Sequence, residues 1–139
     1  DRPRTAFVAE FVGLTNRLRG VAQNGSVEVL GTRVPLLEGS AASGPVTVFV
    51  RPESVQVTPG EDGNGRVLAT SFLGSLSRVQ LQLDDGTLVL AQLASAEAAR
   101  LAPGTAVRVA ARPVPVLATT VQPEAGIPAQ AVPEPQGAG

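Results

Sequence analysis

The side chains that could do chemistry in this 139-residue chain are carboxylates, hydroxyls and arginines. All eleven basic residues are Arg, and the chain contains no Lys, His, Cys, Met, Trp or Tyr. A Walker-type phosphate loop needs Lys, nucleophilic triads need His, and typical zinc sites need His or Cys. The sequence therefore excludes a conventional P-loop ATPase, a Ser-His-Asp or Cys-His hydrolase, a typical zinc site and a disulfide framework within this chain.

Carboxylates are the remaining groups on which catalysis could rest. Asp84 and Asp85 are adjacent, but they precede Gly86 in an expected hairpin turn, where consecutive side chains diverge. Glycosidase-type chemistry needs two carboxylates that face one reacting bond. We therefore predict that the chain is not an enzyme, with no catalytic, cofactor-binding or metal-ligating residue.

The segment Arg51-Pro52-Glu53 offers a second group of reactive side chains, at the end of an expected strand at 46–50. Pro52 has no backbone N–H to donate, so the strand must end, bulge or lie at an edge there. Arg51 and Glu53 are two residues apart and project to the same side. We favour a mutual hydrogen bond that fixes the strand end; the alternative is a contact with a partner domain.

Short strands must position these groups. The pair Asn24-Gly25 is a strong hairpin signal, and residues 78–83 alternate between polar and apolar side chains as a half-buried strand does. Phe7 and Phe11 recur at helical spacing behind Pro3, which predicts a short amphipathic helix. Small antiparallel sheets avoid exposed edges by closing into barrels. We predict an all-β fold of one or two OB-like small barrels with a short N-terminal helix.

A shift of 61 residues superimposes much of the chain on itself. The matched residues are Phe11 and Phe72, Gly13 and Gly74, Arg17 and Arg78, Gly25 and Gly86, Val46 and Val107, Val48 and Val109, and Arg51-Pro52 and Arg112-Pro113. We infer two repeated strand units that pack on each other, because a core of such a small unit alone is marginal. The expected parts are a short helix at 1–13, a first strand unit at 14–58, a connector at 59–65, a second strand unit at 66–112 and a flexible Pro/Ala-rich tail at 113–139.

The charge and the aromatic content argue against a nucleic-acid partner. The formal net charge is -1 and the four aromatic residues are all Phe, whereas OB barrels that bind single strands stack bases on aromatic side chains over a basic groove. No apolar run approaches the ~20 residues that cross a bilayer, and Asp1 does not begin a signal peptide. We therefore expect a soluble module whose partner is a protein or a small ligand.

The opening segment PRTAFVAEFVGLTNRLRG and the later segment VTVFVRPESVQV resemble the C-terminal TOBE regulatory domain of ATP-binding subunits from bacterial ABC importers. In that family a segment of the form FVA.F.G..N.L.G leaves the nucleotide-binding domain, and Arg-Pro-Glu closes a barrel strand downstream. The resemblance covers about residues 3–112. Its matching residues here are Phe7, Val8, Ala9, Phe11, Gly13, Asn16, Leu18, Gly20, Arg51, Pro52 and Glu53.

This resemblance implies an accessory domain that supports dimerisation and regulates ATP-driven solute uptake, with the helix at 1–13 continuing from a missing ATPase domain. ATP and Mg would bind that missing domain. The implied partners are the chain's own ATPase domain, the twin subunit of a homodimer, the transporter membrane subunits, and a regulatory protein or small ligand. The implied location is cytoplasmic, peripheral to the inner membrane. Phe7 and Phe11 would dock the helix onto the barrel or onto the ATPase domain, and the transported substrate stays open.

Residues 15–21 also resemble the first strand of molybdate-binding modules, which are related to TOBE domains and hold an oxyanion with hydroxyls and backbone N–H groups. This resemblance implies Thr15, Arg17, Arg19 and Ser26 as candidate oxyanion ligands. We favour a simpler interpretation, because two Arg at alternate positions are typical of a solvated strand face. Asn16 reads as a turn or capping residue.

Overall fold

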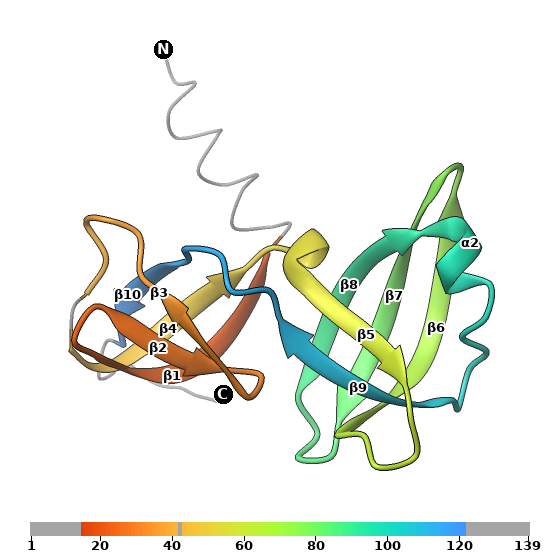
Figure 1. The fold of residues 1–139 in the computed structure, drawn as a ribbon, viewed down its shortest axis with the longest axis horizontal. Helices are drawn as coiled ribbons and strands as arrows, with labels where there is room; N and C mark the ends of the chain where they lie inside the picture. Colours follow the sequence, from red (N-terminus) through yellow and green to blue (C-terminus); the bar gives the residue numbers. More distant parts are fainter. Residues whose placement is uncertain (1–14, 42, 122–139) are drawn as a thin grey trace, which may run out of the picture.

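The computed structural model describes residues 15–41 and 43–121. The expected N-terminal helix, with Phe7 and Phe11, lies outside the described residues, as does the chain beyond residue 121. The described chain forms two five-stranded antiparallel sheets that lie side by side (Figure 1). The predicted all-β fold of small strand units is confirmed. None of the helices in the described ranges is long and apolar enough to span a membrane.

The first sheet has the strand order β10-β4-β1-β2-β3. Asn24 and Gly25 have φ values of 54° and 78°, as a tight two-residue hairpin turn requires, and join the first two strands as predicted. The strands of this sheet are β1 (Asn16–Gln23), β2 (Ser26–Val29), β3 (Thr32–Pro35), β4 (Gly44–Val50) and β10 (Leu117–Thr120).

The second sheet has the order β5-β9-β6-β7-β8. A short 3-10 helix, η1 (Pro52–Ser54), connects the two sheets, because Pro52 ends the preceding strand and begins this turn. The remaining elements are β5 (Val55–Pro59), β6 (Gly65–Leu73), β7 (Leu76–Leu83), β8 (Leu88–Ala94), α2 (Ser95–Ala98) and β9 (Ala106–Ala111). The buried side chains of both sheets form one contiguous cluster made mostly of Val, a residue that suits a pleated, half-buried surface.

The two sheets exchange their last strands. β5 follows β4 in sequence but pairs with β9 in the second sheet, and β10 follows β9 but pairs with β4 in the first. Both exchanges have the same register. Val57 of β5 lies opposite Val109 of β9, and Ala118 of β10 lies opposite Val48 of β4. The 61-residue shift relates the two pairs, because it takes Val57 to Ala118 and Val48 to Val109. The strand after each Arg-Pro pair therefore completes the other unit.

This exchange corrects two predicted boundaries. The first unit does not run unbroken to residue 58, because β5 belongs to the second sheet. The tail does not begin at residue 113, because β10 forms an edge strand and the backbone of Val116 bonds to Pro35 and Leu37 over 3.0 and 2.7 Å. The Pro/Ala-rich composition predicted a flexible tail from residue 113, but the four residues of β10 pair with β4 and are ordered by that pairing.

The single 61-residue shift holds only for the last two strands of each unit. In the two sheet orders, β1, β2 and β3 take the same places as β6, β7 and β8. The 61-residue shift instead matches β1 with β7. Gly20 and Gly65 occupy equivalent places, opposite Val46 and Val107. A side chain at Gly20 would approach Val27 to 2.8 Å, and one at Gly65 would approach the Gln82 carbonyl to 3.1 Å. Because β1 corresponds to β6, the turn at Gly25 corresponds to the β6–β7 turn, and the predicted match of Gly25 with Gly86 is wrong.

Candidate functional site at the junction of the two sheets

Asn16 joins the two sheets through its side-chain amide. Its Nδ2 donates to the Val50 carbonyl over 3.1 Å and to the Leu90 carbonyl over 2.8 Å, and its Oδ1 accepts from the Leu90 N–H over 2.8 Å. Leu90 belongs to β8, the edge strand of the second sheet. Asn16 is therefore neither a turn nor a capping residue: as the buried first residue of β1, it acts as a one-residue extension of the neighbouring sheet.

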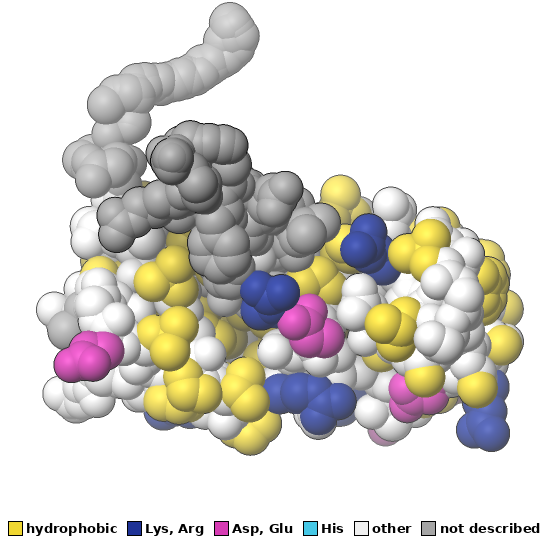
Figure 2. All heavy atoms as spheres, turned by 90° about the horizontal axis from the view of Figure 1, so that it is seen from above, with side chains coloured by type: hydrophobic (Ala, Val, Ile, Leu, Met, Phe, Trp, Pro, Cys, Tyr) yellow, Lys and Arg dark blue, Asp and Glu magenta, His cyan; other side chains and the backbone are white. Residues whose placement is uncertain are grey.

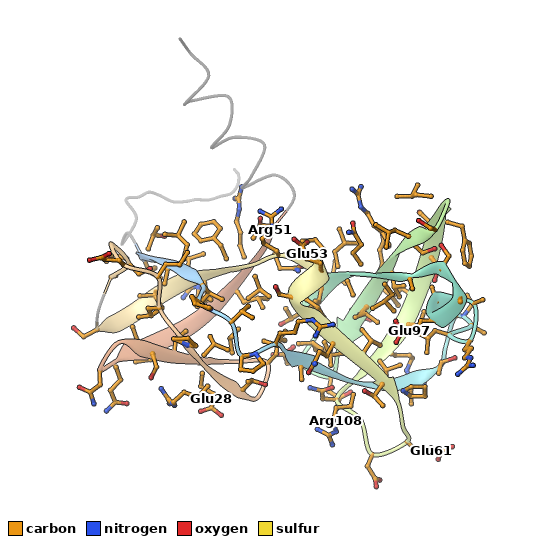
Figure 3. The ribbon with its side chains drawn as sticks, turned by 45° about the horizontal axis from the view of Figure 1, so that its top comes forward. Glu28, Arg51, Glu53, Glu61, Glu97 and Arg108 are labelled. Carbon is orange, nitrogen blue, oxygen red and sulfur yellow. The ribbon has the colours of Figure 1, made fainter. Side chains whose placement is uncertain are left out.

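Arg51 and Glu53 lie beside this bridge, at the connection between the sheets (Figure 3). The hydrogen bond expected between them is present, with 2.7 Å between Arg51 Nε and Glu53 Oε2. Arg112, which follows β9, donates from Nε to the Glu53 carbonyl over 3.2 Å and from its backbone N–H to Ser54 over 2.8 Å. Both Arg-Pro pairs of the repeat therefore meet at η1.

Glu53 stays ionised in this position. Burial acts to raise the pKa of its carboxyl, but hydrogen bonds from Arg51 and from its own backbone N–H, together with the Arg51 charge, outweigh burial and hold the pKa below its usual 4.5. On the face seen in Figure 2, basic and acidic side chains lie side by side near the middle of the molecule, with hydrophobic side chains on both sides. With Arg51, Arg78 and Arg112 around the one carboxylate of Glu53, the junction presents a basic, hydrogen-bonding surface.

A cavity of about 170 Å³ opens at this junction, lined by Arg51, Glu53, Arg78, Leu90 and Gln92 among others. Arg78 and Gln92 are cross-strand neighbours on β7 and β8. No ion pair is found for Arg78 within the described residues. A basic side chain and an amide thus face outward beside the Arg51–Glu53 pair.

A larger cavity, of about 460 Å³, lies between β1 and the β7–β8 turn. It brings together two of the predicted oxyanion residues, Arg17 and Arg19, with Asp85 and Thr87. The Thr87 backbone N–H donates to the Asp85 carboxylate over 3.0 Å, which lowers the pKa of that carboxyl and keeps it charged. The lining of the cavity therefore includes two Arg residues and one acidic residue.

The other two predicted oxyanion residues do not line this cavity. Ser26 lies at the far end of the β1–β2 hairpin, where its hydroxyl donates to the Gln23 carbonyl and accepts from Arg33 over 3.0 Å. Thr15 precedes β1, beside the Asn16 bridge. The structure thus splits the predicted four-residue set, and residues 15–41 and 43–121 contain no group of His, Cys, Asp or Glu side chains that could hold a metal ion.

Sequence reasoning missed two features of the second unit. Asn64 binds the backbone of Val109 twice, donating over 3.0 Å and accepting over 2.7 Å, and so ties β9 to the start of β6. The outward faces of β6, β7 and β8 also carry exposed large side chains, with Leu88 65% exposed. The signal for this face was available in Leu73, Leu76 and Leu88, which take the outward positions of their strands. The apolar side chains of this face are Leu68, Leu73, Leu76, Leu88 and Leu90.

Comparisons with known proteins agree with this description. A family model described as TOBE domain matches residues 48–117. The chain is 38% identical over 114 residues to the sulfate/thiosulfate import ATP-binding protein CysA of Xanthomonas campestris, covering 81% of this chain and 32% of the relative. It is 38% identical over 131 residues to CysA 1 of Chromobacterium violaceum, covering 88% of this chain and 36% of the relative. The chain therefore spans about a third of the length of these relatives.

A solved structure shares the fold. The cytoplasmic molybdate-binding protein ModG, crystallised with molybdate bound, superimposes with a TM-score of 0.61 over 76% of this chain and 96% of that one. The sequence identity is 19%, so this likeness concerns the fold alone.

Proposed function

The chain belongs to the TOBE domain family, and from that premise we propose that it is the accessory domain of the ATP-binding subunit of a sulfate or thiosulfate importer. The observation that carries the proposal is the similarity to two CysA proteins over 81% and 88% of this chain. The Asn16 bridge and the Arg-Pro-Glu turn belong to the segments in which the resemblance to importer subunits is strongest.

The strand exchange suits a bracing role. Because β5 and β10 each complete the other unit, the two sheets cannot separate without breaking a whole strand ladder. We expect a domain built in this way to act as one body. In the proposed subunit it would support the homodimer and regulate uptake, with ATP and Mg bound by the ATPase domain and the whole subunit held at the cytoplasmic side of the membrane by the transporter's membrane subunits.

The test begins with the reading frame around this sequence. We expect a Walker-type ATPase domain upstream of Asp1, and a parent gene without one would refute the proposal. In the full subunit, removing the domain should abolish sulfate uptake and weaken dimerisation while ATP binding to the remaining domain persists. Uptake of a different class of solute, with no response to sulfate or thiosulfate, would retain the accessory role but reject the substrate.

The second candidate function is oxyanion binding, which the cavity with Arg17 and Arg19 favours. Guanidinium groups bind tetrahedral oxyanions well, whereas the Asp85 carboxylate opposes an anion in the same space. Calorimetry with molybdate, tungstate and sulfate tests this directly. Saturable binding that Arg17→Ala weakens and Asp85→Asn strengthens would support it, and an absence of heat with all three anions would reject it.

A further inference from the structure

We propose that residues 68–73 of β6 form a free sheet edge that binds an extended segment of another protein as an added strand. The two repeated units differ at this place. β1 pairs with β4 at seven positions, 16–22, whereas the equivalent strand β6 pairs with β9 at Gly65 and Arg66 only. Within the described chain, residues 68–73 therefore have β7 on one side and no strand on the other. This inference goes beyond the transporter function proposed above and does not depend on it.

The backbone of Thr70 and Phe72 points toward this free edge. A two-residue loop joins Leu73 to Leu76, and the residues that flank such a loop form a hydrogen-bonded pair. Along an antiparallel ladder these pairs alternate with pairs whose N–H and C=O groups point away from the neighbouring strand. Phe72 and Thr70 take the alternate positions, and the backbone hydrogen bonds of the described residues include none from them to the segment at 99–105.

The Asn16 bridge gives the same assignment from the other side of the sheet. Leu90 uses its N–H and its carbonyl for Asn16, so it directs both groups away from β7. Its neighbour across the strands, Gln80, then directs its own N–H and carbonyl at β6, where it pairs with Ala69. The next residue of β6, Thr70, therefore points its backbone groups outward.

A hollow of about 310 Å³ lies along this edge. Thr70 and Phe72 form one wall, and the opposite wall consists of small or apolar residues between α2 and β9, among them Ala98, Leu101 and Pro103. The Phe72 side chain is 58% exposed, and the β6–β7 hairpin projects beyond α2 (Figure 1). The volume corresponds to about ten molecules of liquid water, so there is room for apolar side chains beside the edge.

The sequence of the edge lacks the features that usually prevent strand addition. Exposed edges are commonly blunted by charged side chains or by Pro, and residues 68–73, LATSFL, contain neither. The edge strands β3 and β5 each contain a Pro, Pro35 and Pro59. The free part of β6 is therefore competent to pair with another chain.

An extended backbone is the occupant that fits both the edge and the hollow. Donors and acceptors recur at every second residue of β6, and another strand offers its own groups at the same spacing. In strand addition the main-chain bonds give affinity and alternate side chains enter pockets. We infer a Pro-free segment of a partner protein in which a small apolar residue such as Val enters the hollow and alternates with a polar residue that faces solvent.

A tethered peptide tests this proposal on the full 139-residue chain, which has no Cys of its own. The probe is acetyl-Cys-Gly-Gly-Thr-Val-Thr-Val-Thr-amide, attached through a disulfide to Arg100→Cys, an exposed position beside the hollow. The tether keeps the peptide at a high effective concentration. The amides of Thr70 and Phe72 should become protected from hydrogen exchange about tenfold more strongly, and the Ser71 amide, which already faces β7, should change less.

Two controls separate strand addition from unspecific contact. The same peptide with Pro in place of both Val residues lacks the backbone donors and should give no protection. The original peptide attached to Glu38→Cys, an exposed position outside the second sheet, should give none at Thr70 either. Equal protection from the Pro peptide, or no gain at Thr70 and Phe72 from the original one, would overturn the proposal.

A substitution at the edge provides a second measurement. Phe72→Glu places a charge on the exposed wall of the hollow and should abolish the added protection of the Thr70 amide, whereas Leu76→Glu, at an exposed position on β7, should leave it unchanged. Protection of Thr70 and Phe72 in the chain without peptide would show that the edge is already occupied. If that protection rose with protein concentration together with a dimer that Phe72→Glu dissociates, a second copy would be the occupant and the proposal would be wrong.

Discussion

Asn16→Ala should lower the free energy of unfolding by about 2 to 4 kcal/mol. The side chain makes three hydrogen bonds to buried or partly buried backbone groups, and each contributes roughly 0.5 to 1.5 kcal/mol net. Truncation also leaves the N–H and carbonyl of Leu90 without their partner at a sheet edge. For a domain of this size the loss corresponds to a fall in Tm on the order of 10 °C.

Urea unfolding followed by circular dichroism measures the global effect, and amide hydrogen exchange measures the local one. We expect the Leu90 amide to lose protection in Asn16→Ala. In Asn16→Asp this amide should keep its acceptor, while the two carbonyl groups lose their donor. Gln80→Ala, at an exposed position on the adjacent strand, is the matched control and should change stability by less than about 0.5 kcal/mol.

Two outcomes would contradict the stabilising role of the Asn16 bridge. A stability loss below about 0.5 kcal/mol, no larger than the surface control, would show that the bridge contributes nothing net. Unchanged protection of the Leu90 amide in Asn16→Ala would show that the side chain does not hold this edge of the second sheet.

Thr70, Glu53 and Gly63 each allow a test by a single substitution. Thr70→Val should stabilise the chain by about 1 kcal/mol in urea titrations, because the Thr70 hydroxyl is buried with no hydrogen-bond partner in the described structure and Val keeps the shape of the side chain. A destabilised variant would mean that the hydroxyl has a hydrogen-bond partner. The Arg51–Glu53 pair is partly exposed, so Glu53 should contribute about 0 to 1 kcal/mol of stability. This contribution should be present above the usual pKa of 4.5 and be lost as the pH falls through the lower pKa of the folded state. Glu53→Gln should remove this part of the pH dependence, and identical curves of unfolding free energy against pH for the two proteins would contradict it. Gly63→Ala should lower the free energy of unfolding by roughly 1 to 3 kcal/mol, because a Cβ at this position would overlap the Val107 carbonyl. Gly60→Ala is the control and should be nearly neutral, because a Cβ there would have nothing within 4 Å. Equal melting temperatures for the two variants would refute the close approach at Gly63.

Local patterns in the sequence predicted several of the strands and one of the hairpin turns. Asn24-Gly25 predicted the first hairpin because positive φ at both positions selects those residues, and alternation at 78–83 predicted β7 because one face of it is buried. Pro52 predicted the end of β4 because it has no N–H. Each of these signals depends on neighbouring residues alone.

The same local reasoning failed where the outcome depended on distant partners. Residues 117–120 have a composition that suggests a flexible tail, but they form β10, which pairs with β4 of the first sheet. Asn16 resembles a turn residue in sequence, and only the approach of β8 turns its amide into a bridge. Arg17 and Arg19 share a cavity whereas Ser26 lies outside it, because the β7–β8 turn closes over one end of β1 only.

What the sequence determined by itself is therefore the all-β class, the absence of His-, Cys- and Lys-based chemistry, and the repeated Arg-Pro strand ends. The tertiary structure decided which sheet each final strand joins: β5 pairs with β9 and β10 pairs with β4, each across to the other unit. It also decided that Asn16, Arg51 and Glu53 meet at one junction. Packing between units fixes these outcomes, and no pattern within a single strand encodes them.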